Sequence, residues 1–422
     1  MKLLKSFSSF TLVNFLGAGV GFFVMPILTH YLSPKDYGIL SLINLYISIL
    51  IPFMSLNAFG LLYIDYFNKG NEEGFSQKFS SVFIFPFVNF FFFLISSLIF
   101  KSVIAKYLDI PLFVVPIIPI VALFVIYNEH LLQFLVITKS TVKYVLVNLF
   151  KIIVETSLTL IFIIYLGYNW EGRIYSWLIV IALIATYSYI NFNNSKYLKL
   201  IKPDFVYIKK SLLYGLPLII HVIGKMVVNQ SDRLFISKMV SVEELGVYNV
   251  GYTIGNIISI LSGAFLAVFT PYLFERLANI DYKKKIEIIR MSYVYIFILV
   301  IVLMVISVLS PVFFKYFIDV KYSNGIKYIF WICLSYVFWG GYILFTGYLQ
   351  FLKETKIIAI LAIINISLNF VLNYYFIKFY GSIGAAYATC ISFFVIMIFS
   401  ITISSIKYPM PWLNFRKILN VE

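Results

Sequence analysis

The sequence predicts an all-α membrane protein with about twelve transmembrane helices. Of its 422 residues, 62% are hydrophobic and only 12% are charged, which is more apolar surface than a soluble core of this length needs. Apolar windows of about 20 residues recur along the chain, and a helix of that length crosses the roughly 30 Å hydrocarbon layer. The apolar blocks are solid rather than alternating, which favours helices over a barrel, because every backbone amide in lipid needs an internal partner.

Each expected span is a continuous apolar segment, and short charged loops separate the segments. The first segment is of full length and has no small-residue cleavage site, so we expect a retained anchor rather than a cleaved signal. In chain order the spans are predicted at residues 9–29, 37–63, 79–100, 111–135, 144–166, 174–193, 212–237, 245–274, 289–310, 325–350, 357–377 and 384–405.

Lysine and arginine are distributed unequally between the two sides of the predicted spans. The side that holds both termini carries more than twice as many of them, including the run Lys196–Lys210. The positive-inside rule therefore places both termini in the cytoplasm of a bacterial inner membrane. These short loops also account for the net charge of +15, which favours contact with anionic membrane lipids and argues against a nucleic-acid partner. Cys333 and Cys390 fall inside spans, where buried thiols are expected rather than a disulfide or a metal site.

An internal repeat runs through the chain. Residues 27–43, ILTHYLSPKDYGILSLI, match residues 235–251, FISKMVSVEELGVYNVG, at an offset of 208 residues. A second match pairs the loop 139–141 with 353–355 at an offset of 214. Two matches at nearly one spacing indicate a duplicated half.

Each half would hold six spans, and an even number gives both copies the same orientation. The sequence therefore predicts two six-helix lobes related by a pseudo-two-fold axis along the membrane normal. The N-terminal lobe is expected at 1–208, including the basic connector 194–208, and the C-terminal lobe at 209–422.

Polar residues recur on one face of the seventh predicted span. His221, Lys225, Asn229 and Asp232 follow at steps of four, four and three, and Arg233 is adjacent. Each charge at the bilayer centre costs about 2.5–3.5 kcal/mol on insertion scales, so this face must look into protein or water. The alternatives are that Lys225 pairs with a neighbour, or that Asp232 and Arg233 lie near the outer interface and reach the headgroups.

A second polar stripe lies in the fifth span. Lys151 and Glu155 stand four residues apart, where they can bind a substrate or simply neutralise each other. The offset of 214 carries them onto Asn365 and Asn369, within a run that continues to Asn373. Equivalent helices of both lobes are thus predicted to turn a polar face inward.

Smaller polar sets occur in two further spans. Glu129 and Gln133 share a face in the fourth span, and Asn14 accompanies Gly17 and Gly21 in the first. Small residues at such spacing also serve close helix packing. Taken together, the polar faces predict a central hydrophilic cavity between the two lobes.

Two segments carry a resemblance to a known family. They are TLVNFLGAGVGFFVMPILTHYLSPKDYGILSL at 11–42, with its Leu-Ser-Pro-x-x-Tyr-Gly element, and residues 214–252, with an Asp-Arg pair and a Glu-Leu-Gly-x-Tyr element. The chain resembles the O-antigen and polysaccharide repeat-unit flippases (Wzx-type), the polysaccharide-export branch of the multidrug/oligosaccharidyl-lipid/polysaccharide (MOP) exporter superfamily. The likeness covers essentially the whole chain.

That resemblance implies a V-shaped bundle with a central cavity that opens alternately to each side. The substrate would be an oligosaccharide linked through a diphosphate to undecaprenol, moved from the cytoplasmic to the periplasmic leaflet. A proton or sodium gradient would drive it, and a polysaccharide polymerase and a chain-length regulator are candidate partners. No cofactor or metal is implied. The candidate substrate-binding residues are Lys225 and Arg233 for the diphosphate, with Asn229, His221, Lys151, Asn14, Asn365 and Asn369, and the candidate ion-coupling residues are Asp232, Glu155 and Glu129.

Other functions compete with this one. A multidrug exporter would share the fold but would favour an acidic cavity, and ordinary ion pairs would explain each of the three acids equally well. A polysaccharide polymerase is disfavoured because the outer loops near 101–110 and 311–324 are short. No phosphate-binding loop for ATP is present, and the three histidines have no nucleophile beside them, so an enzyme is not expected. A structural scaffold would have no use for charges inside spans.

Overall fold

The computed structural model describes residues 2–67, 72–199 and 202–412, and at some positions of α1, α4 and α10 it describes the backbone alone. Within these residues the chain is helical and contains no strand. The all-α prediction is therefore confirmed for the part of the chain that the structure describes.

The chain divides into two compact units, Met1–Leu234 and Phe235–Glu422. The division falls inside the long helix α10 (Phe205–Met239), near its C-terminal end. The lobe boundary at 208/209 was drawn from the repeat in the sequence, and it stays a prediction.

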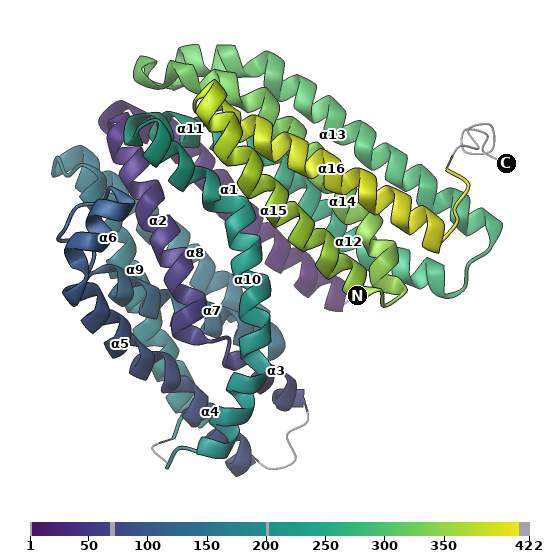
Figure 1. Cartoon of the computed structure of the whole chain (residues 1–422). Coiled ribbons are helices and arrows are strands. Elements are labelled where there is room, and N and C mark those ends of the chain that lie inside the picture. The colour runs from purple at the N-terminus through teal and green to yellow at the C-terminus, as the bar shows by residue number, and fades with distance from the viewer. Residues whose placement is uncertain (1, 68–71, 200–201, 413–422) are drawn as a thin grey trace. The chain divides into compact units, whose positions relative to one another are not determined.

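Unit 1 is built around α7 (Ile118–Ile137), which packs against α2, α5, α8 and α9 (Figure 1). In the same unit, α8 also packs against α1 and α9. Besides α10, the helices of this unit are α1 (Lys2–Tyr31), α2 (Pro34–Ser55), α3 (Phe59–Phe67), α4 (Glu72–Phe83), α5 (Phe85–Ile99), α6 (Lys101–Leu108), α8 (Thr141–Leu160), the π-helical turn η1 (Ile161–Tyr165) and α9 (Trp170–Asn194).

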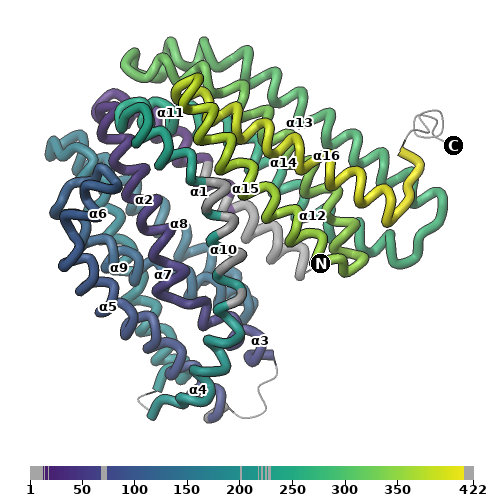
Figure 2. The backbone as a smooth tube through the Cα atoms, viewed as in Figure 1, coloured from purple at the N-terminus to yellow at the C-terminus, as the bar shows by residue number. Residues whose placement is uncertain are grey.

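Unit 2 is built around α14 (Ile326–Phe351), which packs against α11, α12, α13 and α16 (Figure 2). Helix α15 lies along α16. The other elements are α11 (Val242–Gly255), α12 (Ile257–Ala278), α13 (Tyr282–Phe317), the 3₁₀ turn η2 (Val320–Gly325), α15 (Thr355–Tyr380) and α16 (Ile383–Lys407). Cys333 and Cys390 are buried and unpaired, as predicted.

The predicted spans correspond to helices. Among the described residues, ten helices or contiguous helix pairs are long and apolar enough to cross a membrane. The two remaining predicted spans, 9–29 and 212–237, fall on α1 and α10, where part of the side chains is not described. The chain is thus a multi-pass membrane protein.

Two span boundaries were predicted wrongly. The predicted span 37–63 is broken between α2 and α3, where Leu56 and Asn57 adopt positive φ angles of 43° and 49°. The predicted span 111–135 becomes helical only at Ile118, because prolines at 111 and 116 remove amide donors from the preceding segment and Pro119 suits the first turn of the helix. Apolar composition does not reveal such interruptions.

The first pair of repeated segments has the same local structure in both units. The Ser33 hydroxyl accepts the amide of Asp36 at 3.2 Å and caps α2. In the same way, the Ser241 hydroxyl accepts the amide of Glu244 at 3.0 Å and caps α11. Both helices therefore begin with an N-cap three residues before an acidic side chain.

The second pair agrees in greater detail. Lys139 and Lys353 both adopt left-handed conformations, with φ angles of 56° and 61°. The amide of the following residue then bonds back to the carbonyl five residues earlier, at 2.8 Å in one unit and 2.9 Å in the other. Since a left-handed lysine is uncommon, its presence in both turns supports the repeat and makes α7 and α14 equivalent helices at an offset of 214.

Candidate functional site

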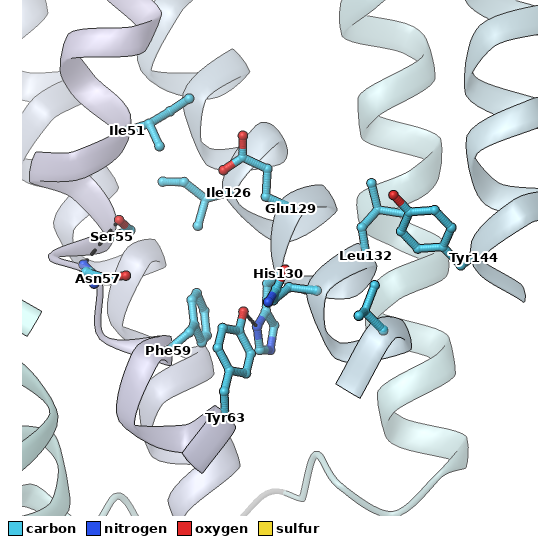
Figure 3. Close-up of a pocket in the computed structure, with 12 residues that line it drawn as sticks. Ile51, Ser55, Asn57, Phe59, Tyr63, Ile126, Glu129, His130, Leu132 and Tyr144 are labelled. Carbon is cyan, nitrogen blue, oxygen red and sulfur yellow. Dashed lines mark hydrogen bonds between the residues drawn. The ribbon is translucent and has the colours of Figure 1, made fainter. Parts of the chain in front are cut away.

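A half-open cavity of about 410 Å³ lies within unit 1, between α2, α3, α7 and α8 (Figure 3). Its volume is in the range of small-molecule sites. The lining combines apolar, aromatic, amide and carboxylate side chains from residues Ile51, Ser55, Asn57, Phe59, Tyr63, Ile126, Glu129, His130, Leu132, Gln133, Val136 and Tyr144.

Glu129 supplies the charge of this cavity from the middle of α7. Its side chain is exposed to the cavity, and Figure 3 shows its carboxylate directed toward the Ile51 side, away from the His130 ring. It forms no hydrogen bond or ion pair with any other residue that the structure describes. The ammonium group of Lys151 on α8 interacts with it electrostatically. Lys151 is not one of the lining residues, so Glu129 is the charged group of the cavity wall.

His130 is buried in the cavity wall next to Glu129 in the chain. Its Nδ1 lies 2.8 Å from the hydroxyl of Tyr63 on α3 (Figure 3), whereas its Nε2 is buried with no hydrogen-bond partner. The ring of Phe59 stacks on the imidazole with centroids 3.8 Å apart and planes at 16°. These contacts fix the Tyr63 hydroxyl at the cavity surface.

Further aromatic rings enclose His130 on the side away from the cavity. Phe79, Phe83, Phe134 and Phe192 have ring centroids between 5.3 and 6.2 Å from the imidazole. Because such close packing leaves little room for another rotamer, the imidazole is held in one orientation. The wall of the cavity is rigid at this point.

The link between α2 and α3 forms another part of the lining. Asn57 faces the cavity, and its backbone amide donates to the Ser55 hydroxyl at 3.3 Å. Gly215 of α10 packs directly against the link, since a Cβ atom at this position would lie 2.3 Å from the carbonyl oxygen of Leu56. Only glycine permits this approach, and it supports a link that has two consecutive left-handed residues.

Glu155 pairs with Arg173 rather than with Lys151, so the structure does not contain local neutralisation, which was one of the two alternatives for this stripe. The Glu155 carboxylate lies 3.2 Å from the guanidinium of Arg173 at the start of α9, and Arg173 also donates to Thr159 at 3.2 Å. Glu155 is thus tied to the next helix. Lys151 is half-buried and interacts electrostatically with Glu129.

Asp232 and Arg233 form an ion pair near the C-terminal end of α10. The carboxylate of Asp232 is buried and lies 3.5 Å from the Arg233 guanidinium. The same oxygen accepts the backbone amide of Arg233 at 2.9 Å. An ion pair is therefore present at Asp232, and the proposed roles of both residues stay predictions.

The asparagines of α15 form a buried ladder. Asn373 donates to the side-chain oxygen of Asn369 at 2.9 Å, and Asn369 donates to Ser392 of α16 at 3.2 Å. The side-chain oxygens of Asn365 and Asn373 are buried without a hydrogen-bond partner. The predicted inward polar face is therefore present, and it packs against α16.

Four predicted site residues have side chains that lie outside the described residues. They are Asn14 in α1 and His221, Lys225 and Asn229 in α10. Their proposed roles are neither supported nor opposed by any contact.

Sequence reasoning found Glu129 and Gln133 but missed most of the cavity. His130 was set aside as an isolated histidine, and Asn57, Tyr63 and Tyr144 were not singled out. One signal was present in the sequence, because Asn128, Glu129 and His130 are three consecutive polar residues in a largely apolar span.

Comparisons with known proteins agree on the kind of protein. A family model described as polysaccharide biosynthesis protein matches residues 3–276, and a second, described as MatE, matches residues 217–375. A curated protein of Haemophilus influenzae, described as an uncharacterized membrane protein, is 26% identical over 372 residues, which cover 86% of this chain and 88% of that protein.

Solved structures share the fold at low sequence identity. An inward-facing multidrug resistance MATE family transporter of the MOP superfamily has a TM-score of 0.72 and 15% identity, with 94% of each chain covered. The lipid II flippase MurJ, in an inward closed conformation, has a TM-score of 0.70 and 20% identity, with 97% of this chain and 89% of that chain covered.

Proposed function

Because this chain belongs to the polysaccharide biosynthesis protein family, within the MOP exporter superfamily, we propose that it is a flippase for lipid-linked oligosaccharides. Its cargo would be O-antigen or capsule-type repeat units linked by a diphosphate to undecaprenol. They would move from the cytoplasmic to the periplasmic leaflet of the bacterial inner membrane. The observation that carries this proposal is the family match over residues 3–276.

A polar cavity inside a membrane-spanning bundle supports a transport function. A cavity with a carboxylate, two amides and several aromatic rings lies within unit 1, where a purely structural bundle would gain more from apolar packing. One solved structure with this fold is described as a lipid II flippase.

Charged groups of unit 1 are proposed to bind the diphosphate and the coupling ion. Lys225 and Arg233 remain the candidates for the diphosphate, because a fixed cation in a partly desolvated site binds an anion more strongly than it does in water. Asp232, Glu155 and Glu129 remain the carboxylates proposed to bind a proton or sodium ion during alternating access. Both termini are proposed to lie in the cytoplasm.

A multidrug-type exporter is the second candidate. The MatE match over residues 217–375 favours it, as does the fold shared with a multidrug resistance transporter. Such a protein exports small molecules, so its deletion would leave surface polysaccharide unchanged.

The test compares a deletion strain with strains that carry single variants. We expect the deletion to abolish surface glycan and to accumulate lipid-linked repeat units. Lys225→Ala should lower surface glycan at least about tenfold, as expected for a lost charge-assisted phosphate contact. Lys356→Ala, at an exposed position of α15, is the matched control and should behave as wild type. Unaltered surface glycan in the deletion would rule out the flippase.

A further inference from the structure

The cavity of unit 1 has the chemistry of a sugar-binding site. Glu129 accepts hydrogen bonds, whereas the amides of Asn57 and Gln133 both donate and accept them. Phe59 and Tyr63 add aromatic rings to the same lining. A pyranose carries hydroxyl groups around its rim and C–H bonds on its faces, so polar groups suit the rim and aromatic rings suit a face.

We propose that this cavity is a saccharide subsite that binds one or two neutral sugar units of the transported oligosaccharide. The inference rests on the proposed function, which supplies the sugar, and it adds the place where the glycan is recognised. A cavity of about 410 Å³ holds part of a repeat unit, and the rest of the substrate remains outside it.

The charge balance favours a neutral ligand over an organic cation. A site for a cation combines aromatic rings with uncompensated negative charge. Here the carboxylate of Glu129 already interacts electrostatically with the ammonium group of Lys151. The remaining polar groups in the lining are uncharged amides and hydroxyls, together with a buried imidazole. Glu129 is therefore the one charged group among the lining residues, and the other polar groups of the lining suit an uncharged ligand.

The Tyr63 hydroxyl is available as a donor. If its proton pointed at Nδ1 of His130, the imidazole would carry its own proton on Nε2, where it would be buried without an acceptor. If Nδ1 carries the proton and donates to the Tyr63 oxygen, only a lone pair is left unpaired at Nε2. In proteins, a buried N–H group without an acceptor is rarer than a buried acceptor without a donor. The second arrangement leaves the phenolic O–H free to donate to a sugar.

The fold does not require these polar residues. At the offset of 214 that relates α7 to α14, Glu129, His130 and Gln133 correspond to Ile343, Leu344 and Gly347. In unit 2 the equivalent helix packs with two aliphatic side chains and a glycine at these positions, and Leu344 is buried. A role in folding therefore does not explain the polar set of unit 1, and a role in binding does.

The cavity lies near the end of α7 that is predicted to face the cytoplasm, the side from which the substrate would enter. Gln133 and Val136 lie in the last two turns of α7, which ends at Ile137. The following turn at Lys139 belongs to the side that the distribution of lysine and arginine assigns to the cytoplasm. Under the proposed function the glycan is presented on that side.

Binding can be tested on the full-length protein in lipid nanodiscs. The probes are the methyl glycosides of glucose, galactose and N-acetylglucosamine, observed by saturation-transfer difference NMR. We expect transfer from wild-type protein to at least one of them. Glu129→Gln keeps the shape of the side chain and should weaken that affinity at least about tenfold, as expected for losing a hydrogen bond to a charged acceptor.

Two further variants control the experiment. Gln133→Ala shortens an exposed lining residue without leaving a buried hole, and it should also weaken binding. Glu171→Gln makes the same charge change in the first turn of α9, outside the lining, and should bind as wild type. Absence of transfer to every glycoside, or equal affinity in wild type and both lining variants, would overturn the proposal. Glu129-dependent binding of tetraphenylphosphonium in place of the sugars would also overturn it.

Surface glycan measured in cells separates this inference from the proposed function. A deletion strain that keeps its glycan refutes the flippase, whichever sugars bind in vitro. A deletion strain that loses its glycan, but recovers it fully with Glu129→Gln or Gln133→Ala at unchanged sugar affinity, refutes the subsite and leaves the flippase in place. Impaired recovery together with weakened sugar binding supports both.

Discussion

Replacing Gly215 with alanine should destabilise unit 1 and distort its cavity. The added Cβ would lie 2.3 Å from the carbonyl oxygen of Leu56 and 3.0 Å from that of Asn57. Ordinary contact begins at 3.4 Å, so α10 and the link between α2 and α3 must separate by about 1 Å. Both obstructing atoms belong to the backbone, which cannot rotate away. Overpacking of this kind costs about 1–3 kcal/mol, a large share of the roughly 5–15 kcal/mol that stabilises a typical domain.

The assay is thermal unfolding followed by circular dichroism in one detergent. Gly263→Ala is the matched control, because no atom lies within 4 Å of a Cβ at that helical position. Alanine should stabilise the helix there by about 0.5–1 kcal/mol. We expect the midpoint of Gly215→Ala to fall and that of Gly263→Ala to hold or rise. Equal midpoints for the two variants would refute the argument that α10 supports the link by direct backbone contact.

Three other substitutions test separate features. Tyr63→Phe should destabilise the protein by about 1–3 kcal/mol because it leaves the buried His130 imidazole with no hydrogen-bond partner. The double variant Tyr63→Phe/His130→Phe should recover most of that loss in a double-mutant cycle measured by thermal unfolding. The free energy of unfolding of Lys353→Val should be about 1–2 kcal/mol lower than that of Lys353→Gly, since φ is 61° there. Equal melting temperatures for the two variants would show that the turn relaxes. The backbone amide of Lys284 holds the pKa of the Asp281 carboxyl below its usual range, so this cap stabilises α13 above the unfolded-state pKa and stops doing so as the pH falls through the lower folded-state value. Asp281→Ala should therefore lower the melting temperature at pH 7, and this decrease should become smaller as the pH falls below the unfolded-state pKa of the carboxyl. A decrease of the same size at every pH would contradict it.

The order of the helices was predictable because lipid demands long apolar segments. Every predicted span overlaps one helix or two consecutive helices, and the repeat was visible from short matches. The interruption at Leu56 and Asn57 was not predictable from composition, since asparagine favours the left-handed conformation but leucine does not. The late start of α7 could have been predicted from its prolines, which were counted only as part of an apolar run.

The candidate site was harder to predict because its contacts join distant segments. His130 depends on Tyr63, 67 residues earlier in the chain, and no spacing rule along one helix relates the two. Glu155 had a suitable partner one turn away in Lys151, yet Arg173 from the next helix is the residue that pairs with it. Periodicity along α15 correctly indicated an inward face, but it could not reveal that Asn369 would bond to Ser392 of α16.

The two halves differ in length by one residue around the π-helical turn η1. The helix α8 begins 214 residues ahead of α15, whereas α9 begins only 213 residues ahead of α16. The continuous helix formed by α8 and η1 has 25 residues and α15 has 26, so the surplus of the first half lies in the connection 166–169, which is longer than the connection 381–382. An extra residue inside a regular helix would rotate everything that follows by about 100°. A connection outside the helices takes up a change of length without rotating the helix that precedes it.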